Sequence, residues 1–149
     1  MKNDQLCIEI GGLKWIVAQS RDVWLLTKDE RDISSPVGQL RNFDDMAKYL
    51  LCLMGGVAYT RQLRAAAPGI RWYREGVDPR VRLEQADSTL EYSDRLLYVD
   101  DEAIDRGHLG EIDAVRFSHP LVMTYEEVDS VFKSGLPQGW FELDIDMIE

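Results

Sequence analysis

Polar and apolar residues alternate along the N-terminal part of the chain with a period of two, which is typical of β-strands with one buried face. The alternation begins at residues 6–10, and Gly11-Gly12 then supplies the positive-φ positions that a two-residue hairpin turn requires. Polar turns at residues 20–22 and 29–32 separate the strands that follow. The pattern predicts an N-terminal antiparallel β-meander.

From Asn42 onward the hydrophobic period changes to that of an α-helix. The apolar stripe consists of Phe43, Met46, Ala47, Leu50, Leu51, Met54, Val57 and Ala58. Arg61 then occupies the phase of this stripe, so we expect one main helix over about 43–58. The stripe should pack on the meander, against Leu6, Ile8, Trp15, Val17 and Leu25.

Tyr49 and Leu53 widen the apolar arc of this helix beyond what one sheet face would cover. A second element of the chain could cover the extra width, and the segment 90–99 is one candidate. A second copy of the chain is the alternative, so the sequence also raises the prediction of a homodimer.

After the main helix the pattern predicts mixed strands. Residues 70–74 and 81–83 are interpreted as a pair of short strands, and residues 114–123 as a strand interrupted at Pro120. The segment 88–99 is ambiguous, because Ser88 and Glu91 would form a helix capping box, whereas residues 96–99 have the composition of a strand.

The last third of the chain predicts a short helix and a terminal strand, joined to the preceding strands by an acidic loop or short helix at 100–106. Thr124 and Glu127 form a capping box for a helix over about 125–133, which Gly135 would end. Residues 140–147 alternate apolar and acidic side chains, so they predict a C-terminal strand.

These elements predict an α+β fold in a single domain over residues 1–149, with a division into 1–67 and 70–149 as the alternative. A hydrophobic content of 45% and a charged content of 30% favour a folded core over disorder. Cys7 and Cys52 have no CxxC spacing, so we expect neither a zinc site nor a disulfide. No export signal or membrane-spanning run is evident, and we therefore expect a cytoplasmic protein.

Negative charge is concentrated in the last third of the chain. The formal net charge is −10, with 27 acidic and 17 basic residues, and residues 100–149 hold 13 of the acids but only 3 of the bases. Direct binding to nucleic acid or an anionic membrane is therefore disfavoured, and a basic protein surface is the expected partner. The predicted partner-binding residues are Asp100, Asp101, Glu102, Glu126, Glu127, Asp129, Glu142, Asp144 and Asp146.

Glu142, Asp144 and Asp146 would project from one strand face at intervals of about 6.6–6.8 Å, in a row that resembles backbone phosphates. Such a face would fit a basic groove that normally receives DNA or RNA. Two other interpretations remain open. The acids would instead protect an exposed strand from edge pairing, or they would pair with the arginines in the centre of the same chain.

That central region contains Arg71, Trp72, Tyr73 and Arg74. Arginine interleaved with aromatic residues is used to bind phosphates and stack bases, and it is also enriched at protein interfaces. In a chain this acidic, the interpretation as arginines that hold carboxylates is favoured over an anion or RNA site.

Catalytic motifs are missing from the sequence: it contains no GxGxxG, GxxxxGK[ST], GxSxG or HExxH. The one candidate cluster is His108 with Glu111 and Asp113, in a segment that flanking glycines place in a loop. It would support a small hydrolase or transferase, and the alternative is an exposed or capping histidine. We predict neither a metal nor a cofactor.

The leading hypothesis is a non-enzymatic acidic module that binds and covers the basic, nucleic-acid-binding surface of a partner protein. Nuclease inhibitors, toxin-neutralising immunity proteins and phage-encoded antagonists of host defence, including anti-CRISPR proteins, share these physical requirements. The alternatives are the small hydrolase or transferase and the arginine–aromatic phosphate or RNA binder.

Overall fold

The computed structural model describes residues 5–10, 12–63, 68–87, 89 and 93–133. Its strands form a seven-stranded antiparallel sheet in the order β1-β2-β3-β4-β7-β6-β5. The strands are β1 (Gln5–Ile10), β2 (Leu13–Ser20), β3 (Val23–Glu30), β4 (Ile33–Leu40), β5 (Val81–Gln85), β6 (Arg95–Val99) and β7 (Gly107–Leu109). The helices are α1 (Phe43–Leu63), α2 (Pro68–Glu75), α3 (Glu111–Leu121) and α4 (Tyr125–Lys133).

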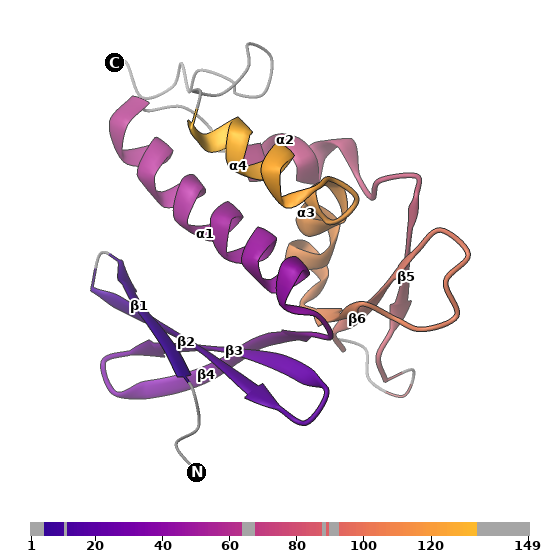
Figure 1. Ribbon diagram of the computed structural model, residues 1–149, viewed down its shortest axis with the longest axis horizontal. Coiled ribbons are helices and arrows are strands. Elements are labelled where there is room, and N and C mark those ends of the chain that lie inside the picture. The colour runs from indigo at the N-terminus through magenta and orange to yellow at the C-terminus, as the bar shows by residue number, and fades with distance from the viewer. Residues whose placement is uncertain (1–4, 11, 64–67, 88, 90–92, 134–149) are drawn as a thin grey trace.

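The helices gather on one side of the sheet (Figure 1). The sheet takes strands from both sides of the 1–67/70–149 boundary, because β4 pairs with β7. None of the described helices is long and apolar enough to cross a membrane. The fold is α+β, as the sequence pattern predicts.

The N-terminal meander is confirmed. Strands β1 to β4 pair in chain order, and the tight turns between them contain positive-φ residues, including Gly12 and Arg21. The register places Val17 opposite Leu26, and both side chains are buried under the helices. Leu25, which we expected in this core, belongs to the opposite face because neighbouring strand residues point in opposite directions.

Helix α1 is confirmed and extends five residues beyond the expected end, to Leu63. Asn42 caps it by accepting a 2.8 Å hydrogen bond from the Asp45 amide. Met46 and Leu50 are buried in the core, as predicted. Phe43 is instead 48% exposed and packs against Trp24, with ring centroids 4.9 Å apart.

The wide apolar arc of α1 is covered by the chain itself. Tyr49 is buried and meets Phe117 of α3 edge-to-face, with ring centroids 5.2 Å apart. Leu53 packs against the same core. The element observed to cover this side of α1 is α3, whereas residues 90–92 of the other candidate segment lie outside the described residues. The apolar arc therefore no longer supports the homodimer, which stays a prediction.

Two segments that we expected to be strands are helices. Residues 70–74 belong to α2, and Trp72 is buried with its ring stacked on His119 of α3. Residues 114–121 belong to α3, where Ala114, Phe117 and Leu121 are buried at helical spacing. Pro120 lies in the last turn of α3, where the loss of one helical hydrogen bond is tolerated.

Residues 96–99 form a strand, and the helix 125–133 is confirmed. Its capping box is present, because Glu127 N donates to Thr124 Oγ1 at 3.1 Å and Thr124 N donates to Glu127 Oε2 at 2.9 Å. The predicted strand 140–147 and the stop at Gly135 lie outside the described residues.

Strand β7 enters the sheet through a close approach that only glycine allows. Gly107 has φ +130°, and a Cβ there would collide with the carbonyl oxygen of Gln39 on β4. His108 follows in the same strand, so it does not lie in the loop that its flanking glycines suggested.

Candidate functional site

Six of the nine acids predicted to bind a partner lie in the described part of the chain, on two segments. Asp100, Asp101 and Glu102 occupy the connection between β6 and β7, whereas Glu126, Glu127 and Asp129 lie on α4. The remaining three, Glu142, Asp144 and Asp146, lie outside the described residues. The fold brings the two described segments together, because Asp100 and Glu126 line the same groove.

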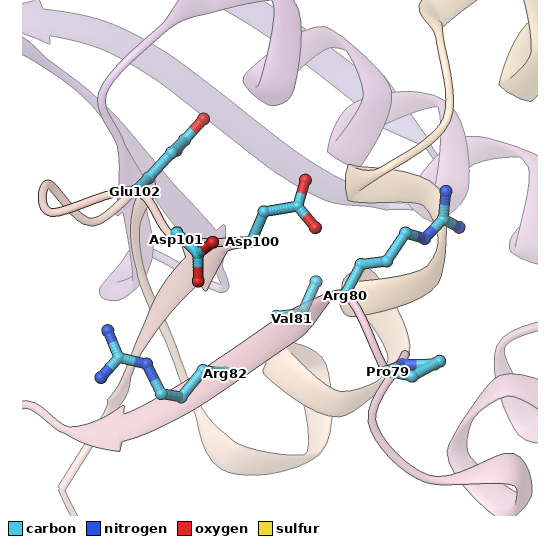
Figure 2. A pocket seen from close by; sticks show the side chains of 7 residues that line it. All are labelled: Pro79, Arg80, Val81, Arg82, Asp100, Asp101 and Glu102. Atoms are coloured by element: carbon cyan, nitrogen blue, oxygen red, sulfur yellow. The ribbon is translucent and has the colours of Figure 1, made fainter.

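The first hollow, which we call the loop groove, has a volume of about 580 Å³ and lies between β5 and the turn after β6. Figure 2 shows Asp100, Asp101 and Glu102 on this turn, beside Arg82 of β5 and Arg80, which immediately precedes that strand. The turn is closed by a 3.1 Å hydrogen bond from the Glu102 amide to the Val99 carbonyl. It therefore presents Asp100 and Asp101 at its tip.

Both arginines of the loop groove are already paired within the chain. Arg80 donates two hydrogen bonds to the Asp78 carboxylate, at 3.1 and 3.3 Å. Arg82 lies 2.6 Å from a Glu84 carboxylate oxygen, and its guanidinium stacks 4.5 Å from the Tyr98 ring centroid. Their positive charge is shared with the carboxylates of Asp78 and Glu84, and Arg80 also attracts Asp100 of the acidic turn without forming an ion pair with it among the described residues.

The second hollow, which we call the central groove, has a volume of about 500 Å³. It shares Arg80 and Asp100 with the loop groove and extends to the first turns of α1 and α4. Its charged lining residues are Asp44, Lys48, Arg80, Asp100, Arg106 and Glu126. The two grooves are therefore continuous around Arg80 and Asp100.

The cations of the central groove are also engaged within the chain. The Lys48 ammonium lies 3.0 Å from the buried Asp45 carboxylate and donates to the carbonyl oxygens of Leu121 and Met123. Arg106 bridges Asp45 and Glu102, with donor–acceptor distances of 2.8 to 3.0 Å. This leaves the groove without an unpaired cation among the residues that line it.

The acids fall into two groups by their partners. Hydrogen bonds from Arg106 lower the pKa of Glu102, Glu127 is held by the α4 cap, and Asp129 lies 2.6 Å from Lys133. Asp100, Asp101 and Glu126 make no ion pair within the part of the chain that the structure describes. We call these three residues the acidic triad.

A third hollow, the apolar groove, lies between β1 and α1 and has a volume of about 420 Å³. Its lining residues are Leu6, Ile8, Phe43, Asp44, Ala47, Leu50, Leu51, Met54 and Tyr125. It meets the central groove at Asp44 and Tyr125, which line both.

The candidate catalytic cluster does not assemble. The nearest acid to His108 is Asp94, with Nδ1 2.7 Å from Oδ2, whereas Glu111 pairs with Arg95 at 3.6 Å. Asp113 faces Tyr49 and Arg116, and burial raises its pKa. Among the described residues, no three His, Cys, Asp or Glu side chains gather closely enough to hold a metal ion.

The arginine–aromatic segment lies on α2 and is not an exposed stacking platform. Trp72 is buried, while Tyr73 is about half exposed and lies 5.9 Å from the Arg116 guanidinium. Arg74 lies exposed in the last turn of the helix, and the side chain of Arg71 is outside the described residues. Trp72 is therefore not accessible for stacking on a base.

Comparisons with known proteins give information on the fold of this chain and none on its function. No protein-family model and no curated protein sequence matches the chain. The structure is similar to that of Rv3902c from M. tuberculosis, with a TM-score of 0.70 and 17% sequence identity over 94% of this chain and 79% of that one. At this identity the likeness establishes the fold alone.

Proposed function

We propose that this protein is a non-enzymatic acidic module that binds a basic surface of a partner protein and covers it. The supporting observation is the acidic triad: Asp100, Asp101 and Glu126 line the loop and central grooves, where every cation is already paired within the chain. Carboxylates without a partner in a hollow attract lysine and arginine side chains, and the hollow concentrates their field.

The acidic surface would first accelerate the association of a partner protein by electrostatic attraction. A partner with a basic patch approaches faster because its charges are attracted over about 8–10 Å at physiological salt, and the contact then excludes other polyanions from the same patch. If that patch is a nucleic-acid site, the complex is inhibited. The module would then act as a nuclease inhibitor, a toxin-neutralising immunity protein or a phage-encoded antagonist of host defence.

The cytoplasm is the compartment that we propose for this interaction. Cys7 and Cys52 are both free thiols, as expected in a reducing compartment.

The test is capture of partners from the native host by the full chain and by the triple variant Asp100→Asn/Asp101→Asn/Glu126→Gln. The control, Asp22→Asn/Asp29→Asn/Asp32→Asn, removes the same charge near the hairpin turns of the meander. We expect the native chain and the control to retain proteins with basic surfaces that are released by salt, and the triple variant to lose them. Equal capture by all three chains, or retention that salt does not affect, would refute the proposal.

A further inference from the structure

The apolar groove is an open hydrophobic surface beside the acidic triad. Leu6 and Phe43 line it and remain 47% and 48% exposed, although the core behind them is closed by Leu50. Side chains of this size are normally buried when the chain offers a partner for them. The groove therefore offers apolar area that a ligand could cover.

The three grooves form one continuous track that changes in chemistry from end to end. The apolar groove joins the central groove at Asp44 and Tyr125, and the central groove joins the loop groove at Arg80 and Asp100. A ligand that follows this track meets aliphatic and aromatic side chains first, then Asp44 and Glu126, and finally Asp100 and Asp101.

We propose that the apolar groove receives a large apolar side chain of the partner protein, from a segment in which this side chain lies next to lysine or arginine. The inference rests on the proposed function and specifies its partner. The apolar side chain anchors the segment in the groove, and the neighbouring cations meet Asp44 and Glu126 at the boundary with the central groove.

Charge complementarity favours this occupant over two others. The Asp44 side chain is 67% exposed at the rim, and Lys48, its nearest cation at 3.6 Å, is buried and already bound to Asp45. A second copy of this chain would bring a net charge of −10 to the same rim. An anionic amphiphile would place its head group against Asp44 and Glu126, whereas a basic segment would relieve their charge.

The first experiment is selection from a random peptide display library on the purified full-length protein. We expect peptides enriched in both lysine or arginine and a large apolar residue at a constant separation. The triple variant Asp100→Asn/Asp101→Asn/Glu126→Gln should select peptides with the apolar residue and less basic charge. The variant Ala47→Met, which fills the apolar groove, should select basic peptides without the apolar residue.

The second experiment measures the affinity of one selected peptide, labelled with fluorescein, by anisotropy. Leu6→Ser opens the wall of the groove, and Ile33→Ser is its control, since Ile33 is 68% exposed and does not line this groove. We expect Leu6→Ser and Ala47→Met each to weaken binding about tenfold or more, and Ile33→Ser to leave it unchanged. Circular dichroism verifies that each variant folds, and the two groove variants test the inference independently.

Failure of this inference can be distinguished from failure of the proposed function. Selected peptides that are basic without a preferred apolar residue would overturn the inference and leave the proposed function standing. Peptides without basic residues would overturn both. Concentration-dependent self-association that Ala47→Met abolishes would assign the groove to a second copy, and displacement of the peptide by a fatty acid at equal concentration would assign it to an amphiphile; either result overturns the inference.

Discussion

The buried ammonium of Lys48 lies 3.0 Å from the buried carboxylate of Asp45, beneath the central groove. The same ammonium donates hydrogen bonds to the carbonyl oxygens of Leu121 and Met123, at 2.9 and 3.1 Å. Lys48 of α1 thereby holds the connection between α3 and α4 in place. This connection leads into the first turn of α4, where Glu126 lies. The pair sets the shape of the groove as well as contributing to stability.

Replacement of Lys48 by methionine should therefore lower the free energy of unfolding by about 3–5 kcal/mol, because it removes an ion-pair partner of the buried Asp45 carboxylate and the hydrogen-bond donor of two carbonyl oxygens. Urea unfolding measures the change. The control is Lys133→Met, which breaks the exposed pair with Asp129 and should cost less than about 1 kcal/mol. Similar costs for both variants would show that the Lys48 pair is solvated.

Leu50→Ala should lower the free energy of unfolding by about 2–5 kcal/mol, since Leu50 is 6% exposed and its removal leaves a cavity between α1 and the sheet. Ile112→Ala is the matched control on an exposed helix position and should change stability by less than about 0.5 kcal/mol. A cost for Leu50→Ala within the range of the control would mean that the α1 stripe is not the core face.

The two thiols should differ in reactivity. Burial raises the pKa of Cys52 to about 12, an effect that nearby Lys48 only partly opposes, whereas Cys7 is exposed on β1. At pH 8 a disulfide reagent such as Ellman's should modify Cys7 rapidly and the half-buried Cys52 much more slowly, because the thiolate is the reactive form. The variant Cys7→Ser isolates Cys52, and rapid modification of this variant in its native state would contradict the assignment.

Asp113 should make the protein less stable as the pH rises. Burial raises its pKa in the folded state above the value of about 3.9 in the unfolded chain, so the folded state binds more protons between these two values. Stability is consequently lost as the pH rises through this window, and Asp113→Asn removes the loss.

The measurement for Asp113→Asn is urea unfolding at pH 3 and pH 7. The free energy of unfolding of the variant, minus that of the native chain, should be larger at pH 7 than at pH 3. The control substitution is Asp22→Asn, at an exposed position on the turn between β2 and β3. A pH-independent effect of Asp113→Asn would mean that the Arg116 charge fully compensates the burial of this carboxyl.

The sequence predicts those elements whose information is local. The meander, α1 and the Thr124–Glu127 cap each depend on residues within one turn or one strand, and the structure confirms them. The sequence pattern predicts a strand interrupted at Pro120 where the structure has α3, although Ala114, Phe117 and Leu121 follow a helical period. The alternation around Trp72 in α2 resembles a strand, because its packing partner, His119 of α3, lies far away along the chain.

The candidate site was predictable in part. The acidic composition of 100–102 and 126–129 is visible in the sequence, but the groove that joins them is not. It depends on the contacts among Asp45, Lys48 and Arg106, which lie up to 61 positions apart. Nothing in the sequence pairs His108 with Asp94 rather than with Glu111 or Asp113, because sequence spacing does not encode cross-strand distance.

The position of β7 in the sheet has a consequence for synthesis of the protein. The meander contains only contacts between neighbouring strands, so it is complete once its 40 residues have left the ribosome. Strand β4 then lacks its second partner, because β7 begins 67 positions after the end of β4 and can approach it only because residue 107 is a glycine. During that interval the backbone groups of β4 that later pair with β7, at residues 38–40, are open to pairing with other nascent chains, and the interval ends once residues 107–109 have left the ribosome and entered the sheet.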